Sequence, residues 1–398
     1  MKNLTNYNIA NKKVLFRADL NVPVFNGKIT DNSRILAIKK SIQKLLENNN
    51  KIFIIAHLGR PKIETKKKYS LKFLSTEIKK IFEIDHEHFI ESLDHKEISN
   101  KINEMKFGEL CLVENIRFNS GEERLDFNFA KDVSEHFDVY VNDAFSVSHR
   151  KHTSIIGFAK YLPAVAGYQL LDEIKNIDIF LQNKKKPNLA IIGGSKISTK
   201  IKLLNNLIEL FSTIFIGGAM ANTFLLANQY SVGTSLVEEN LINVAKGIQK
   251  KAINYGCKLI LPVDVVCSES LQNSENIRYC NINNVLSNQM ILDVGIGTVK
   301  IIRDEIIKSK TVLWNGPLGA FEYKPFDEST KEVANIIKKY SKINNLDALA
   351  GGGDTIASIK AAKAEDGFSY ISNAGGAFLE WLEGNKSPGV LALEENNL

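Results

Sequence analysis

Short apolar runs alternate with amphipathic stretches of helical spacing along the whole chain. Several runs are continuously apolar, which is typical of strands that are buried on both faces of a sheet. Regular alternation of such strands with helices predicts parallel sheets in an α/β fold. The predicted strands are residues 14–16, 52–56, 110–113, 139–141, 189–192, 213–216, 258–266, 311–314, 347–350 and 368–371.

The stretch after the first run illustrates the helical pattern. Apolar residues recur there on one face of a predicted helix: Ile35, Ile38, Ile42, Leu45 and Leu46. Asp31 or Asn32 is suited to cap its N-terminus, because a short polar side chain can accept a hydrogen bond from the first free N–H groups. The sequence therefore predicts one helix that follows the first strand and covers a face of the sheet.

Composition narrows the class of protein. With 398 residues and 44% hydrophobic content, the chain is long enough for two sizeable cores. The net charge of +6 favours anionic partners but does not separate nucleic acid from small phosphates. The four cysteines form no CxxC pair, which argues against a zinc site or a disulfide framework. No signal region and no apolar run of about 18 residues is present, so we expect a cytoplasmic protein.

The residues that follow the predicted strands differ between the two halves of the chain. Ligands of open α/β sheets bind beyond the carboxyl ends of the strands. In the first half these positions hold polar and cationic side chains: Arg17, Asp19, Asn21, His57, Arg60, Asn115, Arg117, Asn142, Asp143, His149 and Arg150. In the second half they are mostly glycines: Gly193, Gly194, Gly217, Gly218, Gly316, Gly351, Gly352, Gly353, Gly375 and Gly376. This contrast predicts two domains with two kinds of anion site.

A linking segment is predicted at residues 168–186. It begins with an apolar helical pattern and ends in three lysines before Pro187, which marks a boundary. The domains are then residues 1–167, which take the small anion, and residues 187–384, which take a nucleotide.

The glycine-rich loops of the second half favour phosphate binding. Glycine lets backbone N–H groups approach a phosphate closely, and the next helix offers its positive end. In the sequence GGGDT at 351–355, Asp354 is suited to Mg²⁺, and Thr355 to a helix cap or a phosphate. An ordinary tight turn explains this one motif equally well. Lys196 and Lys200, after a double glycine, favour a phosphate over two solvated side chains.

The arginines of the first half favour a small anion. Arg34 lies at the start of a predicted helix, where a bound anion would offset its repulsion from the helix dipole. Arg60, Arg117 and Arg150 each follow a strand, and an arginine fork matches carboxylate and phosphate oxygens. With His57, they predict a pocket for an anion with more than one charged group. Arg17 is instead expected to form a salt bridge with Asp19, two residues on.

Several catalytic signatures are missing. The chain has no P-loop, no catalytic-loop motif of protein kinases and no HExxH zinc motif, and no general base stands out at the strand ends. A carboxylate that accepts a phosphoryl group has no proton to lose. A kinase for such an acceptor needs alignment and charge neutralisation rather than a base.

At this point the chain resembles a known family. The matching segments are KVLFRADLNVP at 13–23, HLGRP at 57–61, ENIRF at 114–118, NDAF at 142–145, His149 and Arg150, GGSKISTK at 193–200, WNGP at 314–317, Phe321 and Glu322, GGGDT at 351–355, and SPGV at 387–390. These segments span nearly the whole chain and are similar to those of phosphoglycerate kinase.

The resemblance implies roles for individual residues. It implies that 3-phosphoglycerate or 1,3-bisphosphoglycerate is bound by Asp19, Asn21, Arg34, His57, Leu58, Gly59, Arg60, Arg117 and Arg150. It implies that ADP or ATP is bound by Lys196, Lys200, Gly217, Gly218, Asn315, Pro317, Glu322, Gly352, Gly353, Asp354 and Thr355, with Glu322 on the ribose and Asp354 on Mg²⁺. The catalytic set would be Arg34, Lys196, Gly352 and Gly376.

The resemblance also implies the architecture: two Rossmann-like three-layer α/β domains with parallel sheets facing a central cleft. The tail 385–398 would return to the first domain, segment 168–186 would act as a hinge, and the protein would be a monomer. One departure is the sequence NAGG at 373–376, where Ala374 stands in place of a more usual glycine and restricts the loop.

Two alternatives remain open. A non-catalytic protein of the same fold would bind phosphorylated ligands without turnover. Nucleic-acid binding through the net positive charge is the second alternative. It is disfavoured as the main role, because no stacking aromatic residues accompany the lysine runs.

Overall fold

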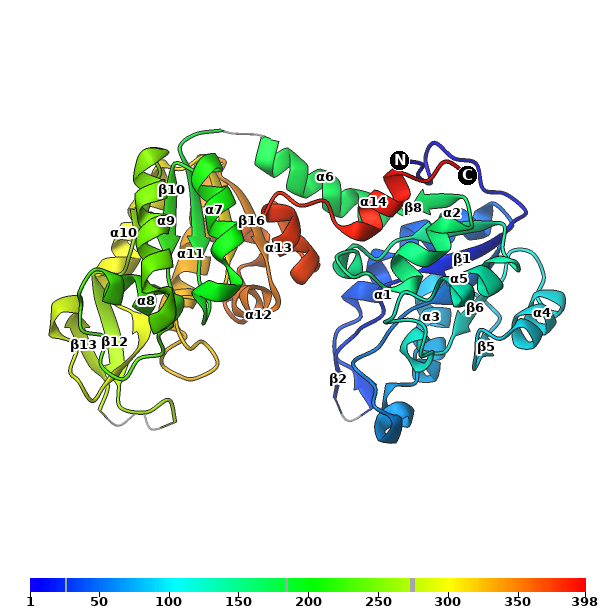
Figure 1. The fold of residues 1–398 in the computed structure, drawn as a ribbon, viewed down its shortest axis with the longest axis horizontal. Helices are drawn as coiled ribbons and strands as arrows, with labels where there is room; N and C mark the ends of the chain where they lie inside the picture. Colours follow the sequence, from blue (N-terminus) through cyan, green and yellow to red (C-terminus); the bar gives the residue numbers. More distant parts are fainter. Residues whose placement is uncertain (26, 183–184, 273–275) are drawn as a thin grey trace. The chain divides into compact units, whose positions relative to one another are not determined.

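The computed structural model describes residues 1–398 except residues 26, 183, 184 and 273–275, and it leaves the side chains of residues 63, 65 and 182 undescribed. The chain divides into two units (Figure 1). Unit 1 comprises residues 1–175 and 386–398, and unit 2 comprises residues 176–385. The boundary falls within helix α6 (Tyr168–Gln182), inside the predicted linking segment 168–186, of which residues 183 and 184 lie outside the described residues.

Unit 1 is built on a six-stranded sheet in which all neighbouring strands are parallel. The strands, in spatial order, are β5 (His88–Ile90), β6 (Leu110–Val113), β4 (Lys51–Ile55), β1 (Lys13–Arg17), β7 (Val139–Asn142) and β8 (Ala164–Ala166). A small hairpin joins β2 (Val24–Phe25) and β3 (Lys28–Ile29). The other helices are α1 (Ser33–Ala37), α2 (Lys39–Glu47), α3 (Ser75–Phe82), α4 (His95–Glu104), α5 (Phe127–Ser134) and α14 (Pro388–Glu394).

Both faces of this sheet are buried, as the continuous apolar runs predicted. Val14 and Phe16 of β1 belong to a core that includes Ile42 of α2 and Ile78 of α3. Leu15, which points to the opposite face, is also fully buried. Successive side chains of a strand point to opposite faces, so a run with no polar position needs cover on both sides.

The helix predicted after the first strand is interrupted. The structure has two helices, α1 and α2, which meet at Ile38. Asn32 occupies the N-cap position without a side-chain capping bond, whereas Asp31 Oδ1 accepts a hydrogen bond from Ser33 N at 2.8 Å. Ile35, Ile38 and Ile42 are nevertheless all buried, as their apolar spacing predicts.

Unit 2 contains a second six-stranded sheet with parallel neighbours throughout. Its strands, in spatial order, are β11 (Lys258–Ile260), β10 (Thr213–Ile216), β9 (Asn188–Ile192), β15 (Thr311–Asn315), β16 (Asp347–Gly351) and β17 (Tyr370–Ser372). The helices are α7 (Ile201–Leu210), α8 (Met220–Ala227), α9 (Ile242–Asn254), α10 (Ile296–Lys308), α11 (Glu328–Asn344), α12 (Gly353–Ala361) and α13 (Gly376–Leu382). Trp314 of β15 is fully buried in the core formed with α10 and α11.

A three-stranded antiparallel sheet in unit 2 was not predicted. It pairs β12 (Asp264–Ser268) with β13 (Arg278–Asn281) on one side and β14 (Met290–Val294) on the other. The single strand predicted at 258–266 is wrong, because β11 and β12 lie in different sheets. Pro262 separates them, and proline has no N–H to donate to a sheet ladder.

The C-terminal segment belongs to unit 1. Gly389 N donates to Ser148 O at 2.8 Å, and Asn396 Oδ1 accepts from Ala164 N at 3.0 Å beside β8. Figure 1 shows both ends of the chain in this unit, with α14 close to β8. Among the described residues, no helix has the length and apolarity needed to cross a membrane.

A substitution in the buried strand β1 tests the core of unit 1. Phe16→Ala removes a fully buried ring, and we expect it to lower the free energy of unfolding by about 3–5 kcal/mol. Phe25→Ala, at a ring that is 69% exposed, should change it by less than about 0.5 kcal/mol. Urea denaturation followed by circular dichroism measures both, and equal midpoints for the two variants would contradict the assignment of β1 to the core.

Candidate active site

A cationic cluster lies at the carboxyl edge of the sheet in unit 1. Strands β6, β4, β1 and β7 are adjacent and parallel, so the residues that end or follow them meet at one edge. His57 is 5% exposed. Burial lowers the pKa of His57 well below its usual value, and the charges of Arg17, Arg117, Arg150 and Arg34 lower it further. The charges of four guanidinium groups therefore act on one imidazole, and Arg17 Nη2 lies 3.3 Å from its Nδ1.

The predicted salt bridge between Arg17 and Asp19 is wrong. Asp19 pairs instead with Arg34 of α1. Arg17 is the last residue of β1 and is 1% exposed, so its guanidinium lies in the protein interior. It donates from Nε to Ser154 Oγ at 2.9 Å and from Nη2 to His57 Nδ1 at 3.3 Å.

The loop after β4 is tied to two other strand ends. Asn21 Oδ1 accepts a hydrogen bond from Gly59 N at 2.8 Å, and Gly59 O accepts one from Arg117. Gly59 has a φ of 58°, and a Cβ there would lie 2.2 Å from the Tyr69 ring. Leu58 is buried, but Arg60 is exposed and is not among the cations that act on His57. Arg60 is thus the one predicted arginine that this structure leaves outside the cluster around His57.

Several buried side-chain nitrogens at this edge lack hydrogen-bond partners among the described residues. They include Arg150 Nε, His149 Nδ1 on the preceding residue, and Asn142 Nδ2 at the end of β7. Burial and the charge of Arg150 lower the pKa of His149 to about 4. Burial also lowers the pKa values of Arg34 and Arg117. Unsatisfied buried donors among crowded cations are the features that a bound anion would correct.

In unit 2, Lys200 occupies the corresponding edge. Lys200 is 9% exposed and donates from Nζ to both oxygen atoms of Asn315, the backbone O at 3.3 Å and the side-chain Oδ1. Asn315 Nδ2 in turn donates to Gly351 O at 2.6 Å, which joins the ends of β15 and β16. Burial lowers the pKa of Lys200 to about 8, against the opposing effect of Asp354.

Lys200 lies at the start of a helix, whereas Lys196 precedes it. A short 3-10 turn occupies Ile197–Thr199, and α7 begins at Ile201 with Lys200 at its N-cap. Lys196 is exposed, in contrast to Lys200. The two lysines therefore differ in burial, and the buried one, Lys200, contacts the end of strand β15 at Asn315.

Two further helices begin at this edge of the sheet. Gly352, with a φ of 102°, is the N-cap of α12, and Asp354 lies exposed in the first turn of that helix after Gly353. Thr355 is buried, and its hydroxyl accepts a hydrogen bond from Gly316 N at 2.7 Å. Gly376 is the first residue of α13 and is exposed. Free N–H groups at these helix starts are suited to anionic oxygens.

Ala374 is accommodated in its loop. It is 2% exposed, and its backbone N donates to Ser372 Oγ at 3.2 Å. The positive φ in this loop, 53°, falls on Gly375. The residue that departs from the expected glycine is therefore not at the position whose conformation requires one.

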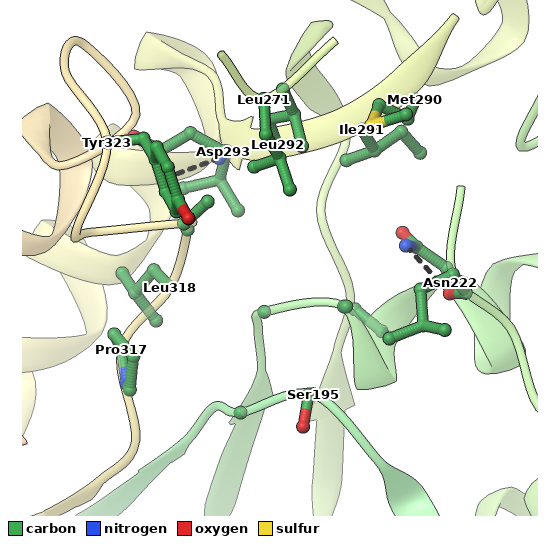
Figure 2. Close-up of a pocket in the computed structure, with 18 of the residues that line it drawn as sticks. Ser195, Asn222, Leu271, Met290, Ile291, Leu292, Asp293, Pro317, Leu318 and Tyr323 are labelled. Carbon is green, nitrogen blue, oxygen red and sulfur yellow. Dashed lines mark hydrogen bonds between the residues drawn. The ribbon is translucent and has the colours of Figure 1, made fainter. Parts of the chain in front are cut away.

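A pocket of about 360 Å³ opens beside these loops (Figure 2). Four predicted residues line it: Gly218, Pro317, Glu322 and Asp354. Gly217 lies next to it, since a Cβ there would meet Leu318 at 2.7 Å. Figure 2 shows Pro317, Leu318 and Tyr323 along one side of the pocket and Ser195 on the loop after β9.

Sequence reasoning missed the opposite wall of this pocket. It is formed by apolar residues of β14 and the neighbouring loops: Leu236, Leu271, Met290, Ile291 and Leu292. The apolar triplet at 290–292 was the available signal, but the strand it forms was not recognised. An apolar slot that adjoins glycine-rich loops, helix N-termini and a buried lysine suits a flat base with an attached phosphate chain.

Comparison of the whole chain with known proteins identifies its family, and so bears on the strand edges of both units. A family model described as phosphoglycerate kinase matches residues 4–385. The chain is 45% identical over 396 residues to the phosphoglycerate kinase of Orientia tsutsugamushi strain Ikeda, covering 99% of this chain and 97% of that protein. It is 42% identical over 389 residues to that of Rhizobium meliloti, covering 98% and 97%.

The chain belongs to the phosphoglycerate kinase family. It has the activity of that family, a phosphotransferase reaction of glycolysis with a carboxyl group as the acceptor. The solved phosphoglycerate kinase of Coxiella burnetii matches with a TM-score of 0.87 and 37% identity over 98% of both chains. That of Pyrococcus horikoshii matches with a TM-score of 0.83 and 28% identity over 99% of this chain and 98% of the other. The predicted α/β class with two parallel sheets is thereby confirmed.

The pKa of Lys200 predicts a pH effect on stability. The unfolded chain holds the proton of this lysine up to its ordinary pKa of 10.5, whereas the folded chain releases it near pH 8. The unfolded state therefore binds more protons in that window, and the free energy of unfolding contributed by Lys200 rises as the pH increases from 8 to 10.5.

The measurement compares urea unfolding of the parent and of Lys200→Met from pH 7 to 10. We expect the parent to gain stability relative to the variant as the pH rises. Parallel pH dependences for the two proteins would contradict the lowered pKa.

Proposed function

We propose a division of labour between the two units. Unit 1 binds 3-phosphoglycerate or 1,3-bisphosphoglycerate at the edge that carries the arginines, and unit 2 binds ADP or ATP at the glycine-rich edge. The sugar-acid ligands are Asp19, Asn21, Arg34, His57, Leu58, Gly59, Arg60, Arg117 and Arg150. The nucleotide ligands are Lys196, Lys200, Gly217, Gly218, Asn315, Pro317, Glu322, Gly352, Gly353, Asp354 and Thr355.

The observation that carries the first half of this proposal is the unpartnered Arg150 Nε within the cluster around His57. Four buried or half-buried guanidinium groups repel one another, and a ligand with both a carboxylate and a phosphate supplies compensating charge. Asp19 carries the opposite sign and holds Arg34 by an ion pair. We infer that Asp19 and Asn21 contact the neutral, hydroxyl-bearing part of the ligand.

The pocket in unit 2 supports the second half. Its apolar lining, with Pro317 and Leu318 on one wall and Leu292 on another, is suited to a purine ring. Glu322 lines the same pocket and is exposed, so its carboxylate is available to ribose hydroxyls. Lys200 would then lie beside the phosphate chain. A bound phosphate would offset the burial that lowers the pKa of Lys200.

The proposed catalytic residues act by charge rather than by proton transfer. The carboxylate of 3-phosphoglycerate attacks without losing a proton, so no base is required. Arg34 and Lys196 would neutralise the oxygens of the phosphoryl group in transit, and the N–H groups of Gly352 and Gly376 would donate to them from helix starts. Direct transfer requires the two substrates to touch, and we propose that segment 168–186 acts as the hinge that permits it.

Asp354 is the proposed ligand of Mg²⁺. It is an exposed carboxylate in the first turn of α12, and Lys200 is close enough to sense its charge. No group of three or more His, Cys, Asp or Glu side chains in the described part of the chain could hold a metal ion. One carboxylate fits Mg²⁺ that is held mainly by nucleotide phosphates, as is usual for this ion. When bound, Mg²⁺ neutralises phosphate charge.

We also propose that the protein works in the cytoplasm as a monomer. The glycolytic activity supports the location, as do its four cysteines, all of which are unpaired.

A coupled assay of ADP phosphorylation by 1,3-bisphosphoglycerate tests the assignment. We expect Arg34→Ala to lower kcat at least about 100-fold, since it removes charge from the transition state. Lys200→Met should raise the KM for ADP about tenfold or more.

Lys202→Met is the matched control, because Lys202 is exposed on the same helix two residues away. It should leave kcat and both KM values within about twofold of the parent. No turnover by the parent protein would favour the non-catalytic alternative, and unchanged kinetics in both test variants would overturn the residue assignments.

Asp354→Asn tests the metal ligand. We expect the Mg²⁺ concentration for half-maximal activity to rise about tenfold, because a neutral amide binds the ion more weakly than a carboxylate does. Asp304→Asn, at an acid of α10 whose side chain is 47% exposed, is the control. A titration of activity with MgCl₂ after removal of metal with EDTA provides the measurement, and identical curves for the two variants would exclude Asp354 as a ligand.

A further inference from the structure

A carboxylate is buried beneath the cationic cluster of unit 1. Glu122 is fully buried, and both of its oxygens are engaged by one residue. Oε1 accepts a hydrogen bond from Ser154 Oγ at 2.6 Å, and Oε2 accepts one from Ser154 N at 2.8 Å. His152 Nδ1 lies 3.6 Å from Oε1. The sequence pattern gave no role to Glu122 or Ser154, since neither of them follows a strand.

The directions of the hydrogen bonds connect this carboxylate to His57. A serine hydroxyl has a single proton, and that of Ser154 is donated to Glu122, so its oxygen accepts from Arg17 Nε at 2.9 Å. A guanidinium group can only donate. His57 Nδ1, 3.3 Å from Arg17 Nη2, must therefore be the acceptor. His57 is then the neutral tautomer, with its proton on Nε2.

We propose that Glu122 is a positioning residue, which acts through Ser154 and Arg17 to hold His57 as a neutral Nε2–H donor for the bound sugar acid. The inference rests on the proposed function in one respect, namely that His57 contacts 3-phosphoglycerate. Glu122 itself touches neither substrate nor nucleotide in this assignment. Its effect reaches His57 through three hydrogen bonds in series.

The charges around His57 explain why this arrangement is needed. The charges of Arg17, Arg117, Arg150 and Arg34 all act on the imidazole, which is itself buried. A protonated His57 would add a fifth cation to this group, whereas the neutral tautomer adds a donor without charge.

Glu122 supplies the opposing charge. Burial disfavours its ionised form, yet its pKa is lowered overall, because His152, Arg17 and Ser154 stabilise the carboxylate. The charge of Glu122 in turn favours the cationic forms of Arg17 and Arg117. One buried anion thus favours the charged forms of two arginines of the cluster, and Arg117 also forms an ion pair from Nε to Glu123 Oε1 at 3.1 Å.

A purely structural role for Glu122 is the competing explanation. Its backbone O accepts a hydrogen bond from Thr153 N at 2.9 Å, so its loop also holds the turn that contains Ser154. A structural role alone predicts that variants lose stability while the imidazole of His57 keeps its tautomer. The positioning role predicts a change at His57 in a protein that remains folded.

The test uses the full-length protein without substrates, with ¹⁵N-labelled histidine. Long-range ¹H–¹⁵N correlation spectra report which ring nitrogen carries the proton. In the parent we expect His57 to be the Nε2–H tautomer throughout pH 6 to 8. Ser154→Ala removes the hydroxyl that orients Arg17, and we expect the His57 signals to show a mixture of tautomers.

Kinetics in the direction of ATP consumption give the second readout. Ser154→Ala should raise the KM for 3-phosphoglycerate about tenfold, the effect expected from losing an oriented hydrogen bond to a charged ligand. The KM for ATP should stay within about twofold of the parent value, since unit 2 is unaltered. Glu122→Gln, which removes the charge, should give the same pattern. If Glu122→Gln does not fold, the result for Ser154→Ala decides the test.

Asp143→Asn is the matched control. Asp143 is another buried carboxylate of unit 1, 1% exposed, and its side chain caps α6 through Leu170 N at 2.9 Å. Asp143 contacts Arg17 only through the backbone, where Asp143 N donates to Arg17 O at 2.9 Å, and the substitution leaves that bond in place. It should change stability without changing the tautomer of His57. If Ser154→Ala leaves both the His57 spectrum and the KM for 3-phosphoglycerate unchanged in an active enzyme, the inference fails while the proposed function stands. If the parent shows no turnover, the proposed function fails, and the spectra still test the link from Ser154 to His57.

Discussion

Parallel pairing of β6, β4, β1 and β7 is the constraint on which the cationic site depends. Because these strands run in one direction, the residues that follow them meet at a single edge of the sheet. His57 and Arg117 come from loops far apart in the sequence, and this pairing alone makes them neighbours. Full burial of both sheet faces fixes the register, since a slip by one residue would exchange the two faces.

Burial at this edge creates the electrostatic problem that a ligand solves. The charges of four guanidinium groups act on buried His57, and Arg150 Nε has no hydrogen-bond partner among the described residues. In unit 2 the same principle applies to a single side chain, Lys200, whose pKa is lowered to about 8 by burial. In both units, therefore, cationic side chains are buried at a cost in desolvation free energy, at the positions where phosphate or carboxylate oxygens would bind. The two edges differ because side chains supply the positive charge in unit 1, whereas backbone N–H groups supply much of it in unit 2.

Glu122 shows how a site of like charges can be held in place without a ligand. A single carboxylate under the cluster, joined to Arg17 through Ser154, gives one arginine a defined orientation. Asp19 does the same for Arg34 through a direct ion pair. In the part of the chain that the structure describes, Arg150 Nε has no such partner, which leaves that donor available.

The sequence by itself determined the α/β class, the two parallel sheets, the glycine-rich and arginine-rich strand ends and the family. Apolar periodicity and strand-end position are local properties, so they can be read without coordinates. The tertiary structure decided what depends on contacts between distant residues. Arg17 pairs with Ser154, 137 residues away, rather than with nearby Asp19. Much of the apolar wall of the pocket comes from β14, and the apolar triplet at 290–292 does not by itself show which sheet or which pocket the strand joins. Lys196 and Lys200 look alike in sequence, and only packing buries one and leaves the other in solvent.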